Sequence, residues 1–257
     1  MMDGADDSMK QHGMYAAVVT GASSGIGAAV SQKLSALGYE VFGIGRKFPP
    51  DDFWQREGVH PVVCDLTDTG KLCEIVRQIT ANQQVRVLVN NAGVGYYGLH
   101  EELNPKKIQE LVRINLEVPM ILTQQLLRHL KKHAGWVINI SSVTAAKTNP
   151  HGCAYGATKA GLASFSASLF EEARKYGVKV VTISPDLTKT NLYRHADFRE
   201  GEEADTYLLP EEVADAAGYI LGQREGMVMT EITIRPQRHQ IRRVQKAKQK
   251  KQDKDQE

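Results

Sequence analysis

The stretch TGASSGIG, residues 20–27, decides the fold because it joins a strand to a helix through three glycines. Residues 15–20 (YAAVVT) form a short apolar run rich in β-branched side chains, which predicts a strand buried on both faces. Residues 24–37 carry apolar side chains at helical spacing, and Gly38 after them is typical of a helix end. The start of such a helix offers free N–H groups and a positive dipole end to an anion.

Each glycine of this turn has a geometric role. Gly21 permits the tight turn, Gly25 lets the backbone approach a phosphate, and Gly27 lets the helix pack close to the sheet. The spacing is G-x-x-x-G-x-G rather than G-x-G-x-x-G, but the physical requirements are similar. The turn therefore predicts a pyrophosphate site, and the alternative is a glycine-rich turn without a ligand.

Strands and helices alternate along the rest of the chain. Further strands are predicted at residues 40–45, 59–64, 85–90, 136–141, 178–184 and 229–234. Further helices are predicted at residues 66–82, 105–133, 155–176 and 210–221. This alternation predicts an α/β fold: a doubly wound, Rossmann-type, mostly parallel seven-stranded sheet with helices on both faces. No linker interrupts residues 14–236, so we expect one domain there.

The composition of the chain, 42% hydrophobic and 24% charged, is typical of a soluble globular protein. Its net charge of +2 is unevenly distributed, because residues 1–13 form an acidic leader of −2 and residues 237–257 a basic tail of +5. The body between them carries −1. We expect the tail to be a disordered or helical extension in solvent. The alternative is a tail that contacts nucleic acid.

The three cysteines, Cys64, Cys73 and Cys153, are odd in number and lack C-x-x-C spacing. We therefore expect neither a disulfide framework nor a metal site, and a reducing compartment. No apolar run is long enough for a membrane span, and residues 1–13 do not resemble a secretory signal. Together these features favour a cytoplasmic protein.

Five motifs resemble the short-chain dehydrogenase/reductase family, in its branch of single-domain proteins of about 250 residues. Residues 20–27 match T-G-x-x-x-G-I-G, residues 90–93 (NNAG) match the turn after the fourth strand, and residues 155–159 (YGATK) match Y-x-x-x-K. Ser142 lies 13 positions before that tyrosine, as the catalytic serine does in the family, and Asn115 occupies the family's helix-borne asparagine position. The resemblance covers most of residues 14–236.

Tyr155 and Lys159 are four residues apart on a predicted helix and so share one face. A nearby ammonium lowers the pKa of a phenol from its usual ~10, so the pair is a plausible acid/base at neutral pH. The resemblance implies that Lys159 also binds a nicotinamide ribose, that Ser142 donates to the carbonyl oxygen, and that Asn115 holds a water linked to Lys159. The alternative for Tyr155 and Lys159 is an ordinary exposed i, i+4 pair. For the catalytic serine, Ser141 is the alternative to Ser142.

The end of the second strand bears on the choice of cofactor. NAD enzymes of this type place an acid there, but this chain has Gly45 followed by Arg46 and Lys47. A cationic pair beside a missing acid favours the 2′-phosphate of NADP(H), with NAD(H) as the alternative. A hydroxyl contact from Ser23 to the cofactor is also expected. The alternative for Arg46 and Lys47 is a solvated basic pair on a surface turn.

The resemblance implies the rest of the cofactor site. Asp65 is expected at the adenine amino group, and Thr188 and Thr190 at the nicotinamide amide. The chain departs from the family's Pro-Gly at Asp186, which places a carboxylate near the nicotinamide. The expected cofactor-binding residues are Gly21, Ser23, Ser24, Gly25, Ile26, Gly27, Arg46, Lys47, Asp65, Leu66, Asn91, Ala92, Gly93, Tyr155, Lys159, Pro185, Thr188 and Thr190.

The substrate is expected beyond the carboxyl ends of the strands. Residues 191–209 are polar and poorly periodic, which is typical of a mobile lid. His151 and Cys153 could form a nucleophile pair, but a small buried cysteine beside a loop histidine is favoured. Fatty-acyl, sugar, steroid and small hydroxy-acid substrates all remain open. The expected wall residues are Tyr96, Tyr97, His151, Cys153 and Tyr193.

These observations predict an NADP(H)-dependent oxidoreductase that interconverts a carbonyl and a secondary alcohol, with Tyr155 as acid/base. The alternatives are a catalytically silent NADP(H)-binding regulatory protein and a protein that contacts nucleic acid through its tail. The resemblance also implies a homo-oligomer, either a dimer or a tetramer.

Overall fold

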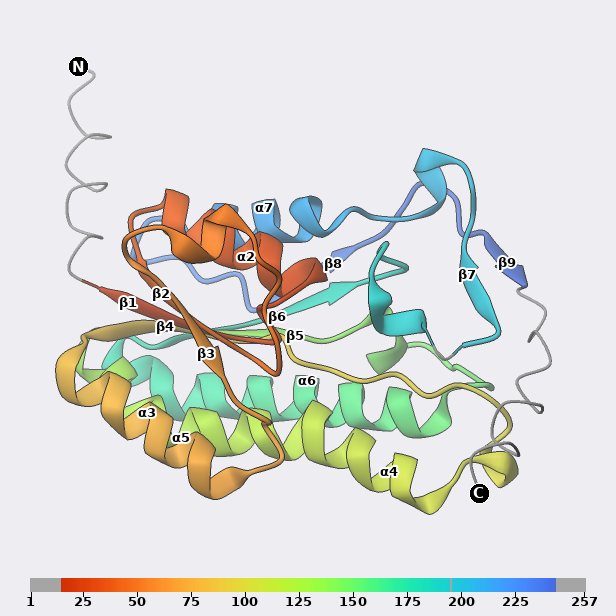
Figure 1. Ribbon diagram of the computed structural model, residues 1–257, viewed down its shortest axis with the longest axis horizontal. Helices are drawn as coiled ribbons and strands as arrows, with labels where there is room; N and C mark the ends of the chain where they lie inside the picture. The colour runs from red at the N-terminus through yellow and green to blue at the C-terminus, as the bar shows by residue number, and fades with distance from the viewer. Residues whose placement is uncertain (1–14, 195, 244–257) are drawn as a thin grey trace.

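A parallel sheet whose strands are apolar on both faces forms the centre of the molecule (Figure 1). The computed structural model describes residues 15–194 and 196–243. The seven strands pair in the order β3-β2-β1-β4-β5-β6-β8, and every neighbouring pair is parallel. The strands are β1 (Ala16–Thr20), β2 (Glu40–Gly45), β3 (Val59–Val63), β4 (Val85–Asn90), β5 (Trp136–Ile140), β6 (Lys179–Pro185) and β8 (Glu231–Ile234). The predicted doubly wound fold is confirmed.

Helices cover both faces of this sheet, as buried parallel strands require. α2 (Gly25–Ala36) and α7 (Pro210–Leu221) pack on one face and share one hydrophobic cluster with it. α3 (Thr69–Asn82), α5 (Val118–Lys132) and α6 (Cys153–Ala173) pack on the other face in a second cluster. Short 3₁₀ turns lie at Asp52–Gln55, His100–Glu102, Val143–Ala145, Arg174–Tyr176, Asn191–Tyr193 and Ala204–Thr206.

The strand order reverses between β1 and β4. β2 and β3 extend the sheet to one side of β1, whereas β5, β6 and β8 extend it to the other side of β4. The loops after β1 and β4 therefore lead away from each other and leave a crevice at the carboxyl ends of the strands.

The predicted single helix over residues 105–133 is interrupted. The structure has α4 (Pro105–Val112), a π-helical turn (Arg113–Glu117) and then α5. A π-helical turn adds one residue to a helical turn, and such turns are frequent at functional sites. Here it contains the buried side chain of Asn115.

A second, two-stranded sheet was not predicted. β7 (Phe198–Glu200) pairs antiparallel with β9 (Ile241–Arg243), and both lie beyond the carboxyl ends of the main sheet (Figure 1). β7 belongs to the segment expected as a mobile lid, and β9 to the tail expected as disordered or helical; for residues 241–243 that expectation is wrong. Three-residue strands are too short for their alternation to show in a sequence. The rest of the tail, residues 244–257, and the leader, residues 1–13, lie outside the described residues.

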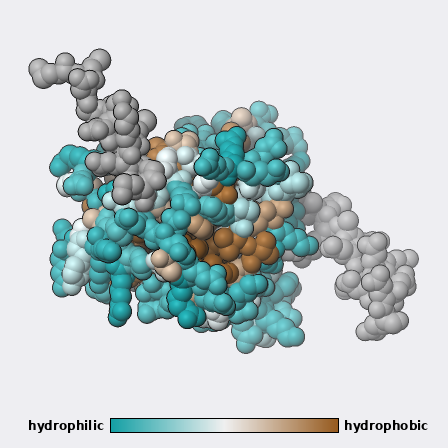
Figure 2. Space-filling model, turned by 60° about the vertical axis from the view of Figure 1, so that its left-hand side comes forward, coloured by the Kyte–Doolittle hydropathy of each residue, from teal (hydrophilic) through white to brown (hydrophobic). Residues whose placement is uncertain are grey.

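On the face in Figure 2, hydrophilic residues cover most of the area and hydrophobic residues gather near the middle of the view. Within residues 15–194 and 196–243, no helix is both long and apolar enough to cross a membrane.

Buried polar side chains connect the two central strands to the helices beneath them. The Asn90 amide donates to Asn139 Oδ1 at 2.8 Å and to Thr123 Oγ1 at 3.3 Å. The Asn139 amide in turn donates to Ser166 Oγ at 2.7 Å. These bonds join β4, β5, α5 and α6, so they tie the sheet to the helix that carries Tyr155.

Replacing Asn139 with alanine tests this connection. Asn139→Ala leaves the buried amide of Asn90 and hydroxyl of Ser166 short of a partner, so the free energy of unfolding should fall by about 2–4 kcal/mol. Urea unfolding followed by circular dichroism measures the change. Ser168→Ala, on the exposed side of α6, is the control and should change it by less than about 0.5 kcal/mol. Equal effects of the two substitutions would contradict the structural role.

Candidate active site

The glycine turn has almost no room for side chains. Gly21 and Gly25 have positive φ angles of 63° and 56°, which favour glycine. A Cβ on Gly21 would lie 2.9 Å from Ala92 Cα, and a Cβ on Gly27 would overlap the Gly21 carbonyl oxygen. A Cβ on Gly25 would lie 3.1 Å from Thr190 Cγ2. Bare backbone at the start of α2 thus leaves a cradle of the kind that a pyrophosphate fits.

Hydrogen bonds hold this turn against the turn after β4. Thr20 Oγ1 accepts from the backbone N–H groups of Asn91 and Ala92, both at 3.0 Å. The Asn91 side-chain amide donates to the carbonyl oxygens of Thr20 at 2.9 Å and Gly21 at 3.3 Å. The side chain of Asn91, expected to line the cofactor, therefore also positions the glycine turn.

A cleft of about 230 Å³ runs from this turn across the carboxyl ends of the strands. It brings together most of the predicted cofactor and catalytic residues, from the glycine turn after β1 to the loop after β6. The predicted residues that line it are Gly21, Ser23, Ser24, Gly25, Ile26, Arg46, Leu66, Asn91, Ala92, Gly93, Ser142, Tyr155, Lys159, Pro185, Thr188, Thr190 and Tyr193.

Four of the predicted cofactor and catalytic residues do not line the cleft. Gly27 is buried beneath the glycine turn, and Lys47 is exposed outside the cleft. Asp65 is exposed, and its Oδ1 accepts from the N–H and hydroxyl of Thr67 at 2.9 and 2.8 Å. These hydrogen bonds lower the pKa of Asp65. The fourth residue is Asn115, which lies behind the wall.

Asn115 is buried by the π-helical turn. Its Oδ1 accepts from the N–H of Val94 at 2.9 Å, and its amide donates to the Val94 carbonyl at 3.0 Å and to Thr158 Oγ1 at 3.1 Å. A Cβ on Gly93 would meet both Asn115 Oδ1, at 3.5 Å, and Lys159 Nζ, at 3.6 Å. Asn115 and Lys159 therefore approach Gly93 from the same side.

Tyr155 and Lys159 are buried side chains of α6. The Lys159 ammonium lies 5.8 Å from the centroid of the Tyr155 ring and donates to the Ile140 carbonyl at 2.8 Å. Lys159 is therefore anchored to the end of β5 rather than bonded to the phenol.

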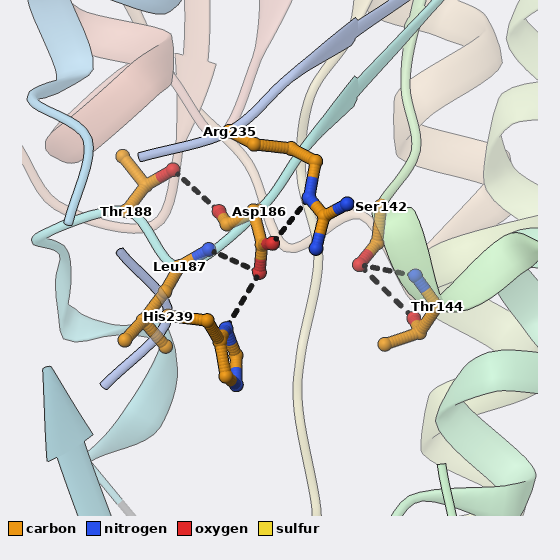
Figure 3. A network of polar contacts seen from close by, with 7 residues as sticks. All are labelled: Ser142, Thr144, Asp186, Leu187, Thr188, Arg235 and His239. Atoms are coloured by element: carbon orange, nitrogen blue, oxygen red, sulfur yellow. Dashed lines mark hydrogen bonds and ion pairs between the residues drawn. The ribbon is translucent and has the colours of Figure 1, made fainter. Parts of the chain in front are cut away.

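Of the two serines after β5, Ser142 is the one hydrogen-bonded to the Tyr155 hydroxyl. Ser142 Oγ also accepts from the N–H and hydroxyl of Thr144 at 3.2 and 3.0 Å (Figure 3). Ser141 Oγ instead donates to the Lys159 carbonyl at 3.1 Å. The two neighbouring hydroxyls thus face different partners.

Burial dominates the acid–base properties of this pair. It raises the pKa of Tyr155 to about 12, and hydrogen bonds from Ser142 and Tyr97 offset only part of the rise. Burial also lowers the pKa of Lys159 to about 8. The expectation that Lys159 lowers the pKa of Tyr155 is therefore wrong for this structure, because desolvation outweighs attraction when both groups are buried.

A second cavity, of about 420 Å³, opens on the other side of Tyr155. Ser142, Tyr155, Asp186 and Tyr193 line both this cavity and the cleft, so the two spaces meet at these side chains. A compound in the second cavity would face the hydroxyls of Ser142 and Tyr155.

Three of the five expected substrate residues, Tyr97, His151 and Tyr193, line the second cavity. Tyr96 does not, and its hydroxyl donates to Glu110 Oε2 at 2.6 Å. Cys153 is also outside both cavities, and its thiol contacts the carbonyl oxygens of Asn149 and Pro150. Cys153 is exposed, which corrects the expectation of a buried cysteine.

The carboxylate of Asp186 points toward Arg235 and His239 (Figure 3). It accepts from Arg235 Nε at 3.1 Å and from the N–H of Leu187 at 2.9 Å, and His239 Nδ1 lies 3.7 Å away. Its side chain is only 7% exposed. Arg235 and His239 were not predicted. A buried carboxylate demands a cation, but a partner 49 residues away gives no local signal.

The fold and these two cavities are those of a dinucleotide-binding α/β enzyme, with a serine and a tyrosine where the cavities meet and a lysine in the cleft beside them. A family model for short chain dehydrogenases matches residues 15–200. The chain belongs to the short-chain dehydrogenase/reductase family. It is thus an oxidoreductase that acts on CH–OH groups with a nicotinamide cofactor.

Relatives span most of the chain. An uncharacterised oxidoreductase of Staphylococcus epidermidis is 30% identical over 225 residues, which are 86% of this chain and 96% of the relative. An NADPH-dependent 3-dehydrocapnine reductase of Ornithobacterium rhinotracheale is 35% identical over 194 residues, 71% of this chain and 69% of that protein. The alcohol dehydrogenase of Thermococcus sibiricus, solved with 5-hydroxy-NADP, superposes with a TM-score of 0.78 at 26% identity, covering 88% of this chain and 99% of that one.

The lowered pKa of Lys159 predicts a pH dependence of stability. Between about pH 8 and 10.5 the unfolded chain holds the Lys159 proton and the folded chain releases it, so folding becomes more favourable as pH rises. The free energy of unfolding of the wild type, relative to Lys159→Met, should increase by roughly 3 kcal/mol across this range.

Urea unfolding at pH 7.5, 9 and 10.5 measures this difference. Lys175→Met removes an exposed lysine just after α6 and is the matched control. A difference between wild type and Lys159→Met that stays constant with pH would show that burial does not lower the pKa of Lys159.

Proposed function

We propose that this protein is an NADP(H)-dependent oxidoreductase that interconverts a carbonyl compound and a secondary alcohol, with Tyr155 as acid/base. The position of Ser142 and Tyr155 in the wall shared by the cleft and the second cavity carries this proposal. A carbonyl in the second cavity faces both hydroxyls.

The residues of the cleft would hold a nicotinamide cofactor, which would supply a hydride to the carbonyl carbon or accept one from the alcohol carbon. Ser142 donates a hydrogen bond to the carbonyl oxygen, where negative charge develops. Tyr155 gives its proton to that oxygen in reduction and takes it back in oxidation, so the sum is one hydride and one proton per carbonyl. A pKa of about 12 keeps Tyr155 protonated at neutral pH, as a proton donor must be.

Lys159 and Asn115 support this proton transfer. The Lys159 ammonium, held by the Ile140 carbonyl, is the buried cation that stabilises a Tyr155 phenolate once the proton has left. Asn115 fixes the loop at Val94, whose neighbour Gly93 lies against both side chains. Lys159 therefore acts through its charge, and Asn115 acts by fixing the position of the loop.

The preference for NADP(H) rests on Arg46. Its side chain is exposed, lines the cleft, and forms no ion pair with any residue in the described part of the chain. Gly45 lies against Ser23, where its missing Cβ would be 3.2 Å from Ser23 Cβ. This strand end thus offers a guanidinium and a hydroxyl, and no carboxylate, to the adenosine ribose, which suits a 2′-phosphate.

The dimer or tetramer and the cytoplasmic location remain predictions. Contact between the tail and nucleic acid also remains one, since residues 244–257 lie outside the described part of the chain.

Substitution of Tyr155 tests the mechanism. Tyr155→Phe removes the transferred proton, so kcat for a ketone found by screening NADPH consumption should fall by about 10²–10⁴-fold. Tyr96→Phe removes a hydroxyl that is bonded to Glu110 outside both cavities, and should retain kcat within about twofold. Full turnover by Tyr155→Phe would refute the acid/base role. A wild type that binds NADPH tightly but reduces no carbonyl in a broad panel would instead indicate the silent binding protein.

Substitution of Arg46 tests the cofactor preference. Arg46→Ala removes a charge-assisted contact to the 2′-phosphate, so the dissociation constant for NADPH should rise about tenfold while that for NADH stays nearly constant. Lys47→Ala, outside the cleft, should change both by less than about threefold. Fluorescence titration with each cofactor gives the constants. Tighter binding of NADH than NADPH by the wild type would overturn the preference.

A further inference from the structure

The second cavity has an excess of positive charge on its wall. Its lining contains basic side chains from two distant parts of the chain, the loop after β5 and the C-terminal segment. These are Lys147, Arg235, His239 and Arg243, against the carboxylates of Asp186 and Asp197. Even with His239 neutral, the wall carries one net positive charge, although the body of the protein is slightly acidic.

The C-terminal segment, residues 235–243, divides its cations between two environments. Arg238 binds Asp205 at 2.6 and 2.7 Å, and Arg242 binds Glu202 at 3.0 Å; neither arginine lines the cavity. Arg243 does line it, as expected for a strand in which successive side chains point to opposite sides. Arg238 and Arg242, outside the cavity, are thus each paired with an acid, whereas Arg235 and Arg243 line the same cavity as Tyr155.

Arg235 is the cation best placed to contact a substrate. Its Nε donates to the buried carboxylate of Asp186, which the N–H of Leu187 holds in turn. Its terminal nitrogens form no hydrogen bond with any residue among 15–194 and 196–243, and Figure 3 shows them on the side toward Ser142. A guanidinium fixed at Nε keeps its terminal N–H groups free for a planar, bidentate contact with an anion.

Aromatic side chains form another part of the cavity wall. Tyr97 contacts Tyr155, Tyr193 and Phe198, with ring centroids 5.1–5.9 Å apart. These rings line the cavity together with Leu187. A ligand that fills the space would therefore place a polar, negative end near Arg235 and an apolar part against the rings.

We propose that the carbonyl substrate carries an anionic oxygen group, a carboxylate or phosphonate-like group, and that Arg235 binds this group while Asp186 positions Arg235. The inference rests on the proposed function, because it concerns the substrate of the same reaction. An oxo acid, NADPH and one proton give the hydroxy acid and NADP⁺. Ser142 holds the oxygen during this step, Tyr155 supplies the proton, and the anion stays unchanged.

Matched pairs of ketones test the substrate class. The probes are 3-oxobutanoate with its methyl ester, and (2-oxopropyl)phosphonate with its dimethyl ester; each pair shares a skeleton and differs in charge. For the better anion, kcat/KM should exceed that of its ester by about tenfold or more, as a charge-assisted contact predicts. The two anions distinguish a carboxylate site from a phosphonate site. An ester that is reduced as well as its acid, in both pairs, overturns the inference and leaves the proposed function intact.

Substitutions locate the anion contact. In Arg235→Gln the acid-to-ester ratio of kcat/KM should approach one. Arg235→Lys keeps the ion pair with Asp186, so its ratio should lie between one and the wild-type value. Arg242→Gln removes a neighbouring cation that faces away from the cavity, and its ratio should equal that of the wild type. An unchanged ratio in both Arg235 variants would refute the role of this residue.

Binding provides a readout that does not require turnover. Calorimetric titration of the NADP⁺-loaded protein with 3-hydroxybutanoate and with its methyl ester should show tighter binding of the acid in the wild type, a smaller difference in Arg235→Lys and none in Arg235→Gln. If no ketone is reduced but this pattern holds, the proposed function fails and the anion site stands. If the ester binds as tightly as the acid, the anion site fails as well.

Discussion

The contact between the glycine turn and the turn after β4 is the interaction on which the site depends. Thr20 and Asn91 exchange backbone and side-chain hydrogen bonds across the point where the strand order reverses. These bonds hold the two turns together beyond Val19 and Val89, the last paired residues of β1 and β4, where the connections lead to opposite sides of the sheet. The absence of side chains at Gly21 and Gly27 allows this approach. The cleft is therefore a consequence of topology that two residues hold in place.

Burial, more than attraction between charges, sets the chemistry next to this contact. Tyr155 and Lys159 lie where water is excluded, so the phenol keeps its proton more strongly and the ammonium less strongly than in water. Both shifts favour the neutral phenol and amine over the phenolate–ammonium pair. Tyr155 is therefore a proton donor, and the ammonium of Lys159 is the charge that compensates the phenolate while the proton is on the carbonyl oxygen.

Sequence patterns predicted the structural features that neighbouring residues determine. The features that the sequence did not predict depend on contacts between distant residues. The buried strand, the glycine turn and the spacing of Tyr155 and Lys159 are each encoded within a few residues, and their positions in the structure follow from that spacing. The pairing of β7 with β9 and the ion pair of Asp186 with Arg235 join segments more than 40 residues apart. The raised pKa of Tyr155 depends on burial by several elements, so neither its direction nor its size follows from the position of Lys159 alone.

Asp186 shows how a long-range contact that the sequence did not predict bears on the reaction. Taken by itself, a carboxylate where the family has glycine places negative charge near the nicotinamide and repels an acidic substrate. In the structure, the same carboxylate is buried and turned toward Arg235, and it holds that guanidinium at the edge of the second cavity (Figure 3). Because a buried carboxylate is stable only with a partner, Asp186 requires the C-terminal segment to fold back over the strand ends. The residue that departs from the family pattern thus explains why this segment forms a wall of the cavity.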